Sequence, residues 1–253
     1  MPKKVAIITG GAGGIGGALV RKYLMNGYDV AAMDINEKAL NSTAEDLSRL
    51  GNYLPLVTDV ADEANVIASV RRVIDHFGDI EALVNNAGGS MGISQEIDQI
   101  PTRDWDKVIN LNLRGTFLCT KAVIPTLKER KSGKIVNISS VAGRGTTIFG
   151  GTPYAASKAG VIGFTRQASR ELGKYGITVN AVAPGLVISG PRMSDYWHNR
   201  KTEEERTAFL NLSPLRRVGV PEDIVDAVYF LTSDGASYVT GAVIDVNGGR
   251  WVG

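Results

Sequence analysis

Residues 5–16 of this 253-residue chain are Val5-Ala6-Ile7-Ile8-Thr9-Gly10-Gly11-Ala12-Gly13-Gly14-Ile15-Gly16. The apolar and β-branched start is typical of a buried strand, and the glycines lead into an amphipathic stretch. Glycines between a strand and a helix let the backbone approach a pyrophosphate, whose negative charge then faces the helix N-terminus. The segment predicts a dinucleotide site at the first strand of an α/β sheet.

The spacing of the glycines leaves two registers open. Gly11, Gly13 and Gly16 satisfy G-x-G-x-x-G, whereas Gly10, Gly14 and Gly16 satisfy G-x-x-x-G-x-G. Both registers place a glycine-rich turn at the start of the same helix.

Asp34 ends the next apolar run, about 20 residues beyond the glycines. A carboxylate at this place can accept hydrogen bonds from ribose hydroxyls, and it repels a 2′-phosphate, so we expect NAD rather than NADP. Two alternatives stay open: Asp34 can cap the helix that follows, and Lys38, one turn further on, can accommodate NADP.

Short apolar runs alternate with longer amphipathic runs along the chain. We expect strands at 5–9, 30–34, 54–59, 82–86, 134–139, 178–183 and 242–246, and helices at 14–26, 37–50, 63–77, 105–128, 154–175 and 221–231. Strands that are apolar throughout and alternate with helices indicate a parallel sheet covered on both faces. We therefore expect one Rossmann-type, doubly wound α/β domain over residues 1–253, with a seven-stranded parallel sheet flanked by helices.

Residues 186–213 interrupt this alternation. The segment contains Asp195-Tyr196-Trp197-His198 and Glu203-Glu204-Glu205. A long irregular segment is often a lid, so we expect it to cover a substrate. The alternative is a solvated excursion with a short surface helix.

Composition favours small-molecule partners. The formal charge is +2 and the basic residues are dispersed, so we expect no nucleic-acid or membrane partner. No apolar run is long enough to span a bilayer. Cys119 is the only cysteine, which excludes an internal disulfide, and the only histidines are His76 and His198, so we expect no metal site. These features predict a cytoplasmic protein.

Polar and glycine-containing clusters follow several of the expected strands. They are Asn85-Asn86-Ala87-Gly88, Ser139-Ser140 and Pro184-Gly185. Because ligands of open parallel sheets bind at the carboxyl ends of the strands, these clusters and the glycines should line one crevice.

Tyr154 and Lys158 are four residues apart on an expected helix and therefore lie on one face of it. With a pKa near 10, only about one free tyrosine in a thousand is ionised at pH 7. A shift of about three units needs about 4 kcal/mol, which one cation at about 4 Å supplies in an effective dielectric of about 20. The spacing predicts a tyrosine that exchanges protons near neutral pH.

Together these motifs resemble the short-chain dehydrogenase/reductase family, in its classical subfamily. The matching residues are Thr9-Gly10-x-x-x-Gly14-Ile15-Gly16, Asn85-Asn86-Ala87-Gly88, Ser140, Tyr154-x-x-x-Lys158 and Pro184-Gly185. They occur in the order and spacing of the family, and the resemblance covers essentially the whole chain.

The resemblance implies a set of cofactor contacts. They are Gly10, Gly14 and Gly16 for the dinucleotide, with backbone contacts from Gly13 and Ile15; Asp34 for the adenosine ribose; Asp59 and Val60 for adenine; Asn86, Ala87 and Gly88 along the cofactor; and Pro184, Gly185, Val187 and Ser189 around the nicotinamide. Ser189 stands where a threonine is more usual, and it keeps the hydroxyl. Taken alone, Asp59 would be a turn residue.

The resemblance also implies a catalytic tetrad of Asn112, Ser140, Tyr154 and Lys158. Tyr154 would be the general acid or base, and Ser140 would steady the substrate oxygen, with Ser139 as the alternative. Lys158 would lower the pKa of Tyr154 and bind the nicotinamide ribose. Asn112, rather than Asn110, would interrupt its helix and hold a water of the proton relay.

The expected activity is NAD(H)-dependent hydride transfer between nicotinamide and a secondary alcohol or ketone. The alternatives are an NADPH-dependent 3-oxoacyl-thioester reductase of the same family and a dinucleotide-binding protein without catalysis. We expect specificity to lie in residues 89–97, 144–152 and 186–213. The resemblance implies a homotetramer, with helices 105–128 and 154–175 as subunit contacts and 248–251 near another interface.

Overall fold

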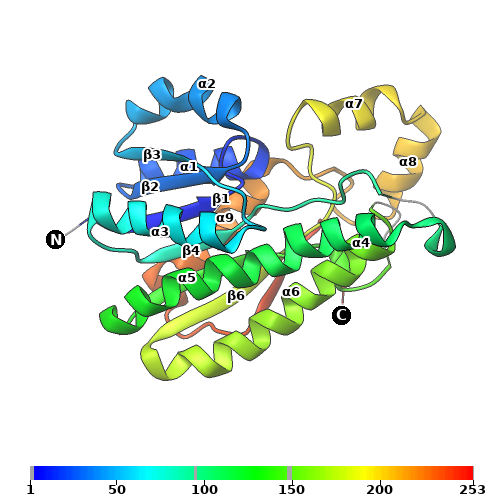
Figure 1. Ribbon diagram of the computed structural model, residues 1–253. Coiled ribbons are helices and arrows are strands. Elements are labelled where there is room, and N and C mark those ends of the chain that lie inside the picture. The colour runs from blue at the N-terminus through cyan, green and yellow to red at the C-terminus, as the bar shows by residue number, and fades with distance from the viewer. Residues whose placement is uncertain (1–2, 94–95, 147–149, 253) are drawn as a thin grey trace.

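The computed structural model describes residues 3–93, 96–146 and 150–252, and a parallel sheet runs through it (Figure 1). Its seven strands are β1 (Val5–Thr9), β2 (Asp29–Asp34), β3 (Tyr53–Val57), β4 (Ala82–Asn85), β5 (Gly133–Ile138), β6 (Ile177–Pro184) and β7 (Val243–Val246). Neighbouring strands are parallel and follow the order β3-β2-β1-β4-β5-β6-β7. The predicted doubly wound α/β fold is confirmed.

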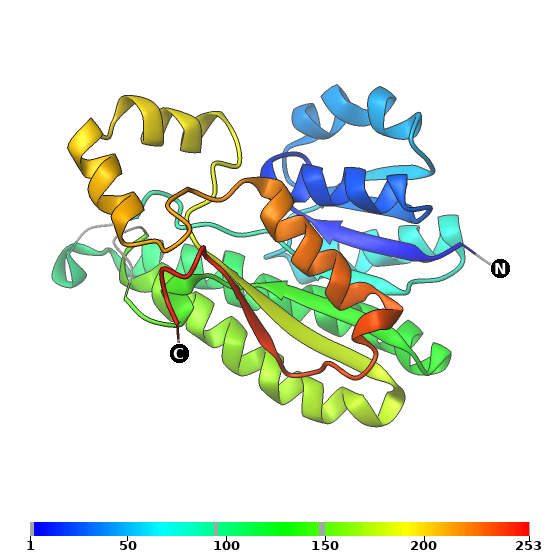
Figure 2. The ribbon, with the colours of Figure 1, turned by 180° about the vertical axis from the view of Figure 1, so that it is seen from behind.

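Helices cover both faces of the sheet. They are α1 (Gly14–Met25), α2 (Glu37–Ser48), α3 (Glu63–Phe77), α4 (Thr102–Ile109), α5 (Gly115–Arg130), α6 (Gly151–Leu172), α7 (Pro191–Asn199), α8 (Glu203–Asn211) and α9 (Pro221–Thr232). Figure 1 shows α3, α5 and α6 in front of the sheet, and Figure 2 shows α1 and α9 on the opposite face. No helix of the described ranges combines the length and the hydropathy needed to cross a membrane.

Alternate residues of β1 enter two separate cores. Ala6 and Ile8 pack in the core on the side of α1, α2 and α9, whereas Val5 and Ile7 pack on the side of α3, α5 and α6. Successive strand side chains point to opposite faces, so a strand covered on both sides must be apolar throughout. Cys119 lies in the second core, where burial raises the pKa of its thiol to about 12.

The helix expected at 105–128 is interrupted, and Asn112 explains the interruption. The Asn112 side-chain Nδ2 donates to the carbonyl of Val108 at 2.9 Å, the acceptor that its own backbone N–H would use in an α-helix. A π-helical turn, η2 (Asn110–Arg114), therefore separates α4 from α5.

The irregular segment 186–213 contains the two helices α7 and α8. Thr202 begins α8 with a capping box, in which its hydroxyl accepts from the Glu205 N–H and the Glu205 carboxylate accepts from the Thr202 N–H. Trp197 of α7 packs edge-on against Phe209 of α8, with ring centroids 5.3 Å apart. The segment is thus a packed helix pair.

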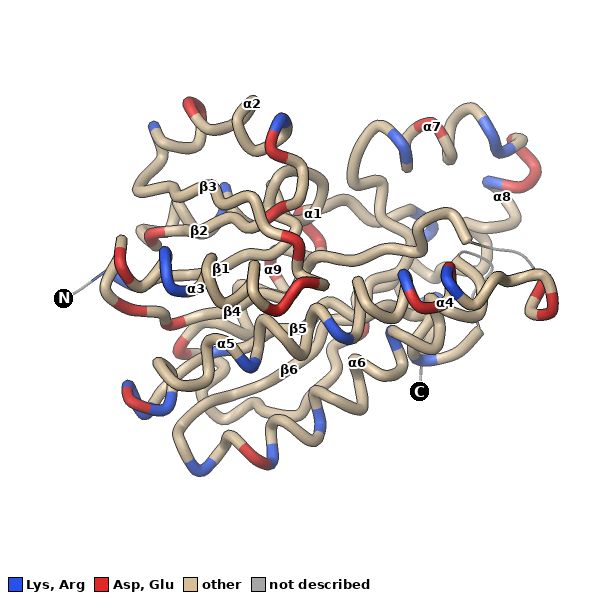
Figure 3. The backbone as a smooth tube through the Cα atoms, in the orientation of Figure 1, with Lys and Arg blue, Asp and Glu red and all other residues tan. Residues whose placement is uncertain are grey.

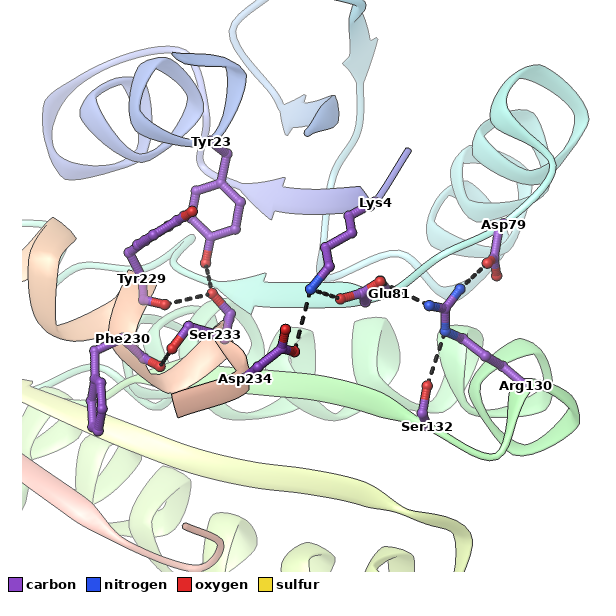
Figure 4. Close-up of polar contacts among 11 residues, drawn as sticks. Lys4, Tyr23, Asp79, Glu81, Arg130, Ser132, Tyr229, Phe230, Ser233 and Asp234 are labelled. Atoms are coloured by element: carbon purple, nitrogen blue, oxygen red, sulfur yellow. Dashed lines mark hydrogen bonds and ion pairs between the residues drawn. The ribbon is translucent and has the colours of Figure 1, made fainter. Parts of the chain in front are cut away.

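A cluster of ion pairs lies at the amino ends of the strands (Figure 4). Glu81, which is buried just before β4, pairs with Lys4 at 3.0 Å and with Arg130 at 2.8 Å. Lys4 also reaches Asp234, and Arg130 reaches Asp79. Elsewhere, basic and acidic residues are interspersed along the backbone (Figure 3). The charged cluster ties β1, β4 and α5 together at the edge opposite the glycine turn.

Candidate active site

A cavity of about 560 Å³ lies at the carboxyl ends of the strands. Every residue expected to contact the cofactor, and Ser140, lines it: Gly10, Gly13, Gly14, Ile15, Gly16, Asp34, Asp59, Val60, Asn86, Ala87, Gly88, Tyr154, Lys158, Pro184, Gly185, Val187 and Ser189. Asn112 does not line this cavity. The sheet therefore gathers segments from most of the chain at one edge.

The backbone selects one register for the glycine motif. Gly10 and Gly14 have φ of +65° and +56°, which favours glycine at both positions. A Cβ on Gly16 would lie 1.9 Å from the carbonyl oxygen of Gly10, so only glycine fits there. Gly13 is extended and a Cβ on it would meet nothing within 4 Å. The register is Gly10-x-x-x-Gly14-x-Gly16, and the first residues of α1 line the cavity, where the free N–H groups of a helix N-terminus favour an anion.

Asp34 lies beside this turn at the end of β2. Its Oδ2 accepts from the Ala12 N–H at 3.1 Å and its Oδ1 accepts from the Asn36 N–H at 2.9 Å. The following helix is capped by Asn36, whose side chain accepts from the Ala39 N–H at 3.0 Å. The alternative that Asp34 caps this helix is wrong. Lys38 is exposed and does not line the cavity.

Thr9 and Asn86 join the ends of β1 and β4. The Thr9 hydroxyl oxygen accepts from the backbone N–H of Asn86 and of Ala87, both at 3.0 Å. The Asn86 side chain donates to the carbonyls of Thr9 and Gly10 at 2.9 and 3.2 Å. These bonds hold the glycine turn against the Asn86-Ala87-Gly88 segment.

Asp59 lines the cavity and also makes a turn. Its Oδ1 accepts from the Ala61 N–H at 2.9 Å, and its own N–H donates to the Asn65 side chain at 2.6 Å. The interpretation of Asp59 as a turn residue is therefore compatible with its place in the cavity wall.

Tyr154 and Lys158 lie on α6, where Lys158 is buried and Tyr154 is half-buried at the cavity wall, and this changes their ionisation. The Lys158 Nζ donates to the Ile138 carbonyl at 2.7 Å, and burial lowers its pKa to about 8. Burial raises the pKa of Tyr154, and a hydrogen bond with Ser140 opposes this increase. The Lys158 Nζ lies 5.7 Å from the centre of the Tyr154 ring. The lowered tyrosine pKa expected from the spacing is not found, because the loss of hydration outweighs the hydrogen bond with Ser140.

The two serines at the end of β5 differ in their contacts. The Ser139 hydroxyl donates to the Lys158 carbonyl at 2.9 Å, whereas the Ser140 hydroxyl accepts from the Ala142 N–H at 3.1 Å and bonds Tyr154. Both line the cavity. The contact with Tyr154 favours Ser140 over Ser139 as the substrate-facing hydroxyl.

Asn112 is buried and its side chain binds the loop after β4. Its Oδ1 accepts from the Gly89 N–H at 2.9 Å, and its Nδ2 donates to the Gly89 carbonyl at 3.0 Å. A Cβ on Gly88 would lie 2.4 Å from the Asn112 Oδ1 and 3.1 Å from the Lys158 Nζ, so these groups converge around a bare backbone. Asn110 is exposed, which favours Asn112.

Several residues that line the cavity were not singled out one by one from the sequence. They include Met33, Thr58, Ser90, Leu111, Arg192 and Met193. Ser90, Arg192 and Met193 fall within residues 89–97 and 186–213, which were expected to set specificity. The other three directly precede predicted site residues along the chain. Of the loops expected to set specificity, residues 94–95 and 147–149 lie outside the described residues.

The approach of Gly16 to Gly10 yields a test on adjacent glycines. We expect Gly16→Ala to lower the free energy of unfolding by several kcal/mol and to weaken dinucleotide binding, because the methyl group would strike a backbone carbonyl. Gly17→Ala is the control: its Cβ would meet ordinary contacts at 3.9 Å, and alanine favours the helix by up to about 1 kcal/mol. Urea unfolding of both variants measures the difference, and equal stability would contradict the described turn.

Comparison with known proteins agrees with this geometry. The model of the short chain dehydrogenase family matches residues 4–200. A (2S)-[(R)-hydroxy(phenyl)methyl]succinyl-CoA dehydrogenase subunit of Thauera aromatica is 41% identical over 248 residues, 98% of this chain and 96% of that protein. A 3-oxoacyl-[acyl-carrier-protein] reductase of Thermotoga maritima is 40% identical over 252 residues, 97% of each chain.

Among solved structures, levodione reductase matches with a TM-score of 0.90 and 34% identity, covering 98% of this chain and 97% of that one. Sequence family, relatives and fold thus agree over nearly the whole length. The chain belongs to the short-chain dehydrogenase/reductase family.

Proposed function

We propose that this oxidoreductase transfers a hydride between NAD(H) and a secondary alcohol or ketone, with Tyr154 as the general acid or base. One observation carries the proposal: Tyr154, Ser140 and Lys158 line the same cavity as the glycine turn and Asp34. Proton-handling groups and dinucleotide-binding groups therefore share one space. A dinucleotide-binding protein without catalysis would not need this combination.

The residues present fit a nicotinamide dinucleotide. Gly10, Gly14 and Gly16 leave bare backbone at the N-terminus of α1, which suits a pyrophosphate. The Asp34 carboxylate lies beside this turn, where it would accept hydrogen bonds from ribose hydroxyls and repel a 2′-phosphate. When bound, the nicotinamide supplies the hydride chemistry. Pro184, Gly185, Val187 and Ser189 would surround that ring.

Tyr154 would hold the proton that the substrate oxygen gains or loses. Because burial raises its pKa, the phenol stays protonated near neutral pH, the state that donates to the oxygen of a ketone during reduction. Ser140 would donate to the same oxygen and stabilise the charge that develops on it. Oxidation needs the phenolate, which positive charge in the cavity would favour.

Lys158 and Asn112 would support this pair. The ammonium of Lys158, held by the Ile138 carbonyl, would bind the nicotinamide ribose. The Asn112 side chain hydrogen-bonds backbone groups of Gly89 and Val108, so we propose that it positions the loop after β4. A relay water at Asn112 stays a prediction.

A second candidate substrate class is a 3-hydroxyacyl or 3-oxoacyl thioester. The names of the Thauera aromatica and Thermotoga maritima relatives both specify acyl groups carried on coenzyme A or on a carrier protein. Such substrates still present a secondary alcohol or ketone to Tyr154. NADPH as their reductant is the alternative that the Asp34 carboxylate disfavours.

We also propose that residues 186–213 act as a lid, since Arg192 and Met193 of α7 line the cavity.

We further propose a homotetramer. On α5, Phe117 is 45% exposed and lies edge-on to Phe164 of α6, so the two helices share an apolar surface that a second subunit could cover. A location in the cytoplasm stays a prediction.

Replacement of the proposed acid tests the mechanism. We expect Tyr154→Phe to lower turnover at least about 100-fold while NADH binding changes little, because only the proton donor is lost. Tyr238→Phe, at a fully exposed tyrosine, should retain wild-type turnover. Steady-state rates measure turnover and NADH fluorescence titrations measure binding. Full activity of Tyr154→Phe would contradict the role of Tyr154 as general acid or base.

Replacement of the proposed ribose ligand tests cofactor choice. We expect Asp34→Ala to weaken NADH binding about tenfold and to improve NADPH binding, since the ribose acceptor and the repelling charge both disappear. Asp46→Ala, on the exposed face of α2, should leave both affinities unchanged. If the wild-type protein binds NADPH more tightly than NADH, the argument from Asp34 is wrong.

A further inference from the structure

A second cavity, of about 480 Å³, adjoins the first. Leu186 lines both, and the other walls come from α8, the loop after it and the C-terminal segment beyond β7. Figure 2 shows this C-terminal segment passing beside α8. The aromatic and charged residues that line it are Phe209, Arg217, Asp223, Asp245 and Arg250.

The two arginines and two aspartates that line this cavity do not all pair with one another. Arg217 pairs with Asp223 through both terminal nitrogens, each at 2.6 Å. Asp245 accepts from Arg144 at 2.9 Å. Arg250 makes no ion pair within the described part of the chain. Each carboxylate is therefore engaged by another arginine, and one guanidinium is left over.

The Arg250 guanidinium is held in place although no anion neutralises it. Its carbon lies 3.7 Å from the centre of the Phe209 ring, a stacked cation–π contact. Its Nη1 is buried and has no hydrogen-bond partner among the residues that the structure describes, and burial lowers the pKa of the group. A buried donor that lacks a partner is costly, and a carboxylate or phosphate oxygen would satisfy it.

A second buried atom in the same lining lacks a partner. The Asp245 Oδ1, an acceptor where Arg250 is a donor, is buried and accepts no hydrogen bond from any residue of the described ranges. A ligand that carries an anionic group and a hydroxyl or amide N–H would satisfy both atoms.

The second cavity lies directly against the proposed active site. The Gly185 N–H donates to the Val246 carbonyl at 2.9 Å, so the end of β7 packs on the Pro184-Gly185 segment that lines the first cavity. Arg144, which binds Asp245, directly follows the η3 turn (Val141–Gly143) after Ser140. A substrate whose reacting carbon lies near Tyr154 could extend past Leu186 into the second cavity.

We propose that the second cavity is an anion subsite of the substrate, in which Arg250 binds a carboxylate or phosphate remote from the reacting alcohol or ketone. This inference rests on the proposed function, since it assigns the substrate of that same site a negative charge. Phe209 belongs to α8, so the bound anion would also fasten the proposed lid to the C-terminal segment.

Calorimetric titration of the NADH-saturated protein tests the subsite without requiring turnover. Glutarate serves as the carboxylate probe and inorganic phosphate as the phosphate probe, and the bound NADH keeps both away from the glycine turn. The variants are Arg250→Gln and Arg250→Lys. The matched control is Arg216→Gln, which removes the same charge from an exposed residue of the adjoining loop that does not line the cavity.

We expect Arg250→Gln to weaken binding of the tighter probe at least about tenfold, with Arg250→Lys between it and the wild type, and Arg216→Gln unchanged. Tighter glutarate would indicate an acid substrate, and tighter phosphate a phosphorylated one. Equal binding by wild type and Arg250→Gln would overturn the subsite. A change in the molecular mass of Arg250→Gln, measured by light scattering, would also overturn the subsite, because it would show that Arg250 contacts another subunit.

Kinetics on a ketone bearing a free carboxylate and on its methyl ester complete the test. The wild type should favour the acid in kcat/KM by about 10-fold or more, and Arg250→Gln should lose that preference through KM while keeping its rate on the ester. Activity on the ester with no preference for the acid would overturn only the subsite. If NADH does not bind, or if none of the ketones reacts, the proposed function itself is contradicted.

Discussion

The close approach of Gly16 to the carbonyl of Gly10 is the constraint on which the site depends. No side chain fits between α1 and the end of β1, so the helix starts directly at the sheet edge and directs its first N–H groups into the cavity. The same turn receives the Asp34 carboxylate through Ala12 and the Asn86 side chain through Gly10. The ends of β1, β2 and β4 are thereby aligned around one corner of the cavity.

Burial has opposite consequences for the two groups on α6. It lowers the pKa of Lys158 to about 8 and raises that of Tyr154, so both groups shift toward their neutral forms, although a lysine with this pKa is still mostly protonated at pH 7. In the proposed mechanism the protonated phenol next to Ser140 would donate to the substrate oxygen, and formation of the phenolate would depend on the charge that a ligand brings. The ion-paired amino edge around Glu81 lies at the other end of the strands, away from this chemistry.

The sequence predicted the sheet and the cavity lining because both follow from local rules: apolar strands, glycines at strand ends, and the shared carboxyl edge of parallel strands. The interruption of the helix at Asn112 was expected from the resemblance, although its π-helical form and the bond to Val108 were not. The pKa of Tyr154 was predicted in the wrong direction, because spacing gives the nearness of a lysine but not the loss of water around both groups. Arg250 and its cavity could not be foreseen, since they join α8 to the C-terminal segment across the fold.

If the glycine turn and Tyr154 serve one reaction, the protein should oxidise or reduce nicotinamide in the presence of its substrate, which a panel of ketones and secondary alcohols measures. The panel should include neutral and anionic members and acyl thioesters, each assayed with NAD(H) and NADP(H) by the absorbance of the reduced nicotinamide. The account predicts substrate-dependent oxidation of NADH, faster than that of NADPH. A protein that binds the reduced nicotinamide yet oxidises it with no member of the panel would contradict it, whereas a reaction with NADPH alone would contradict only the argument from Asp34.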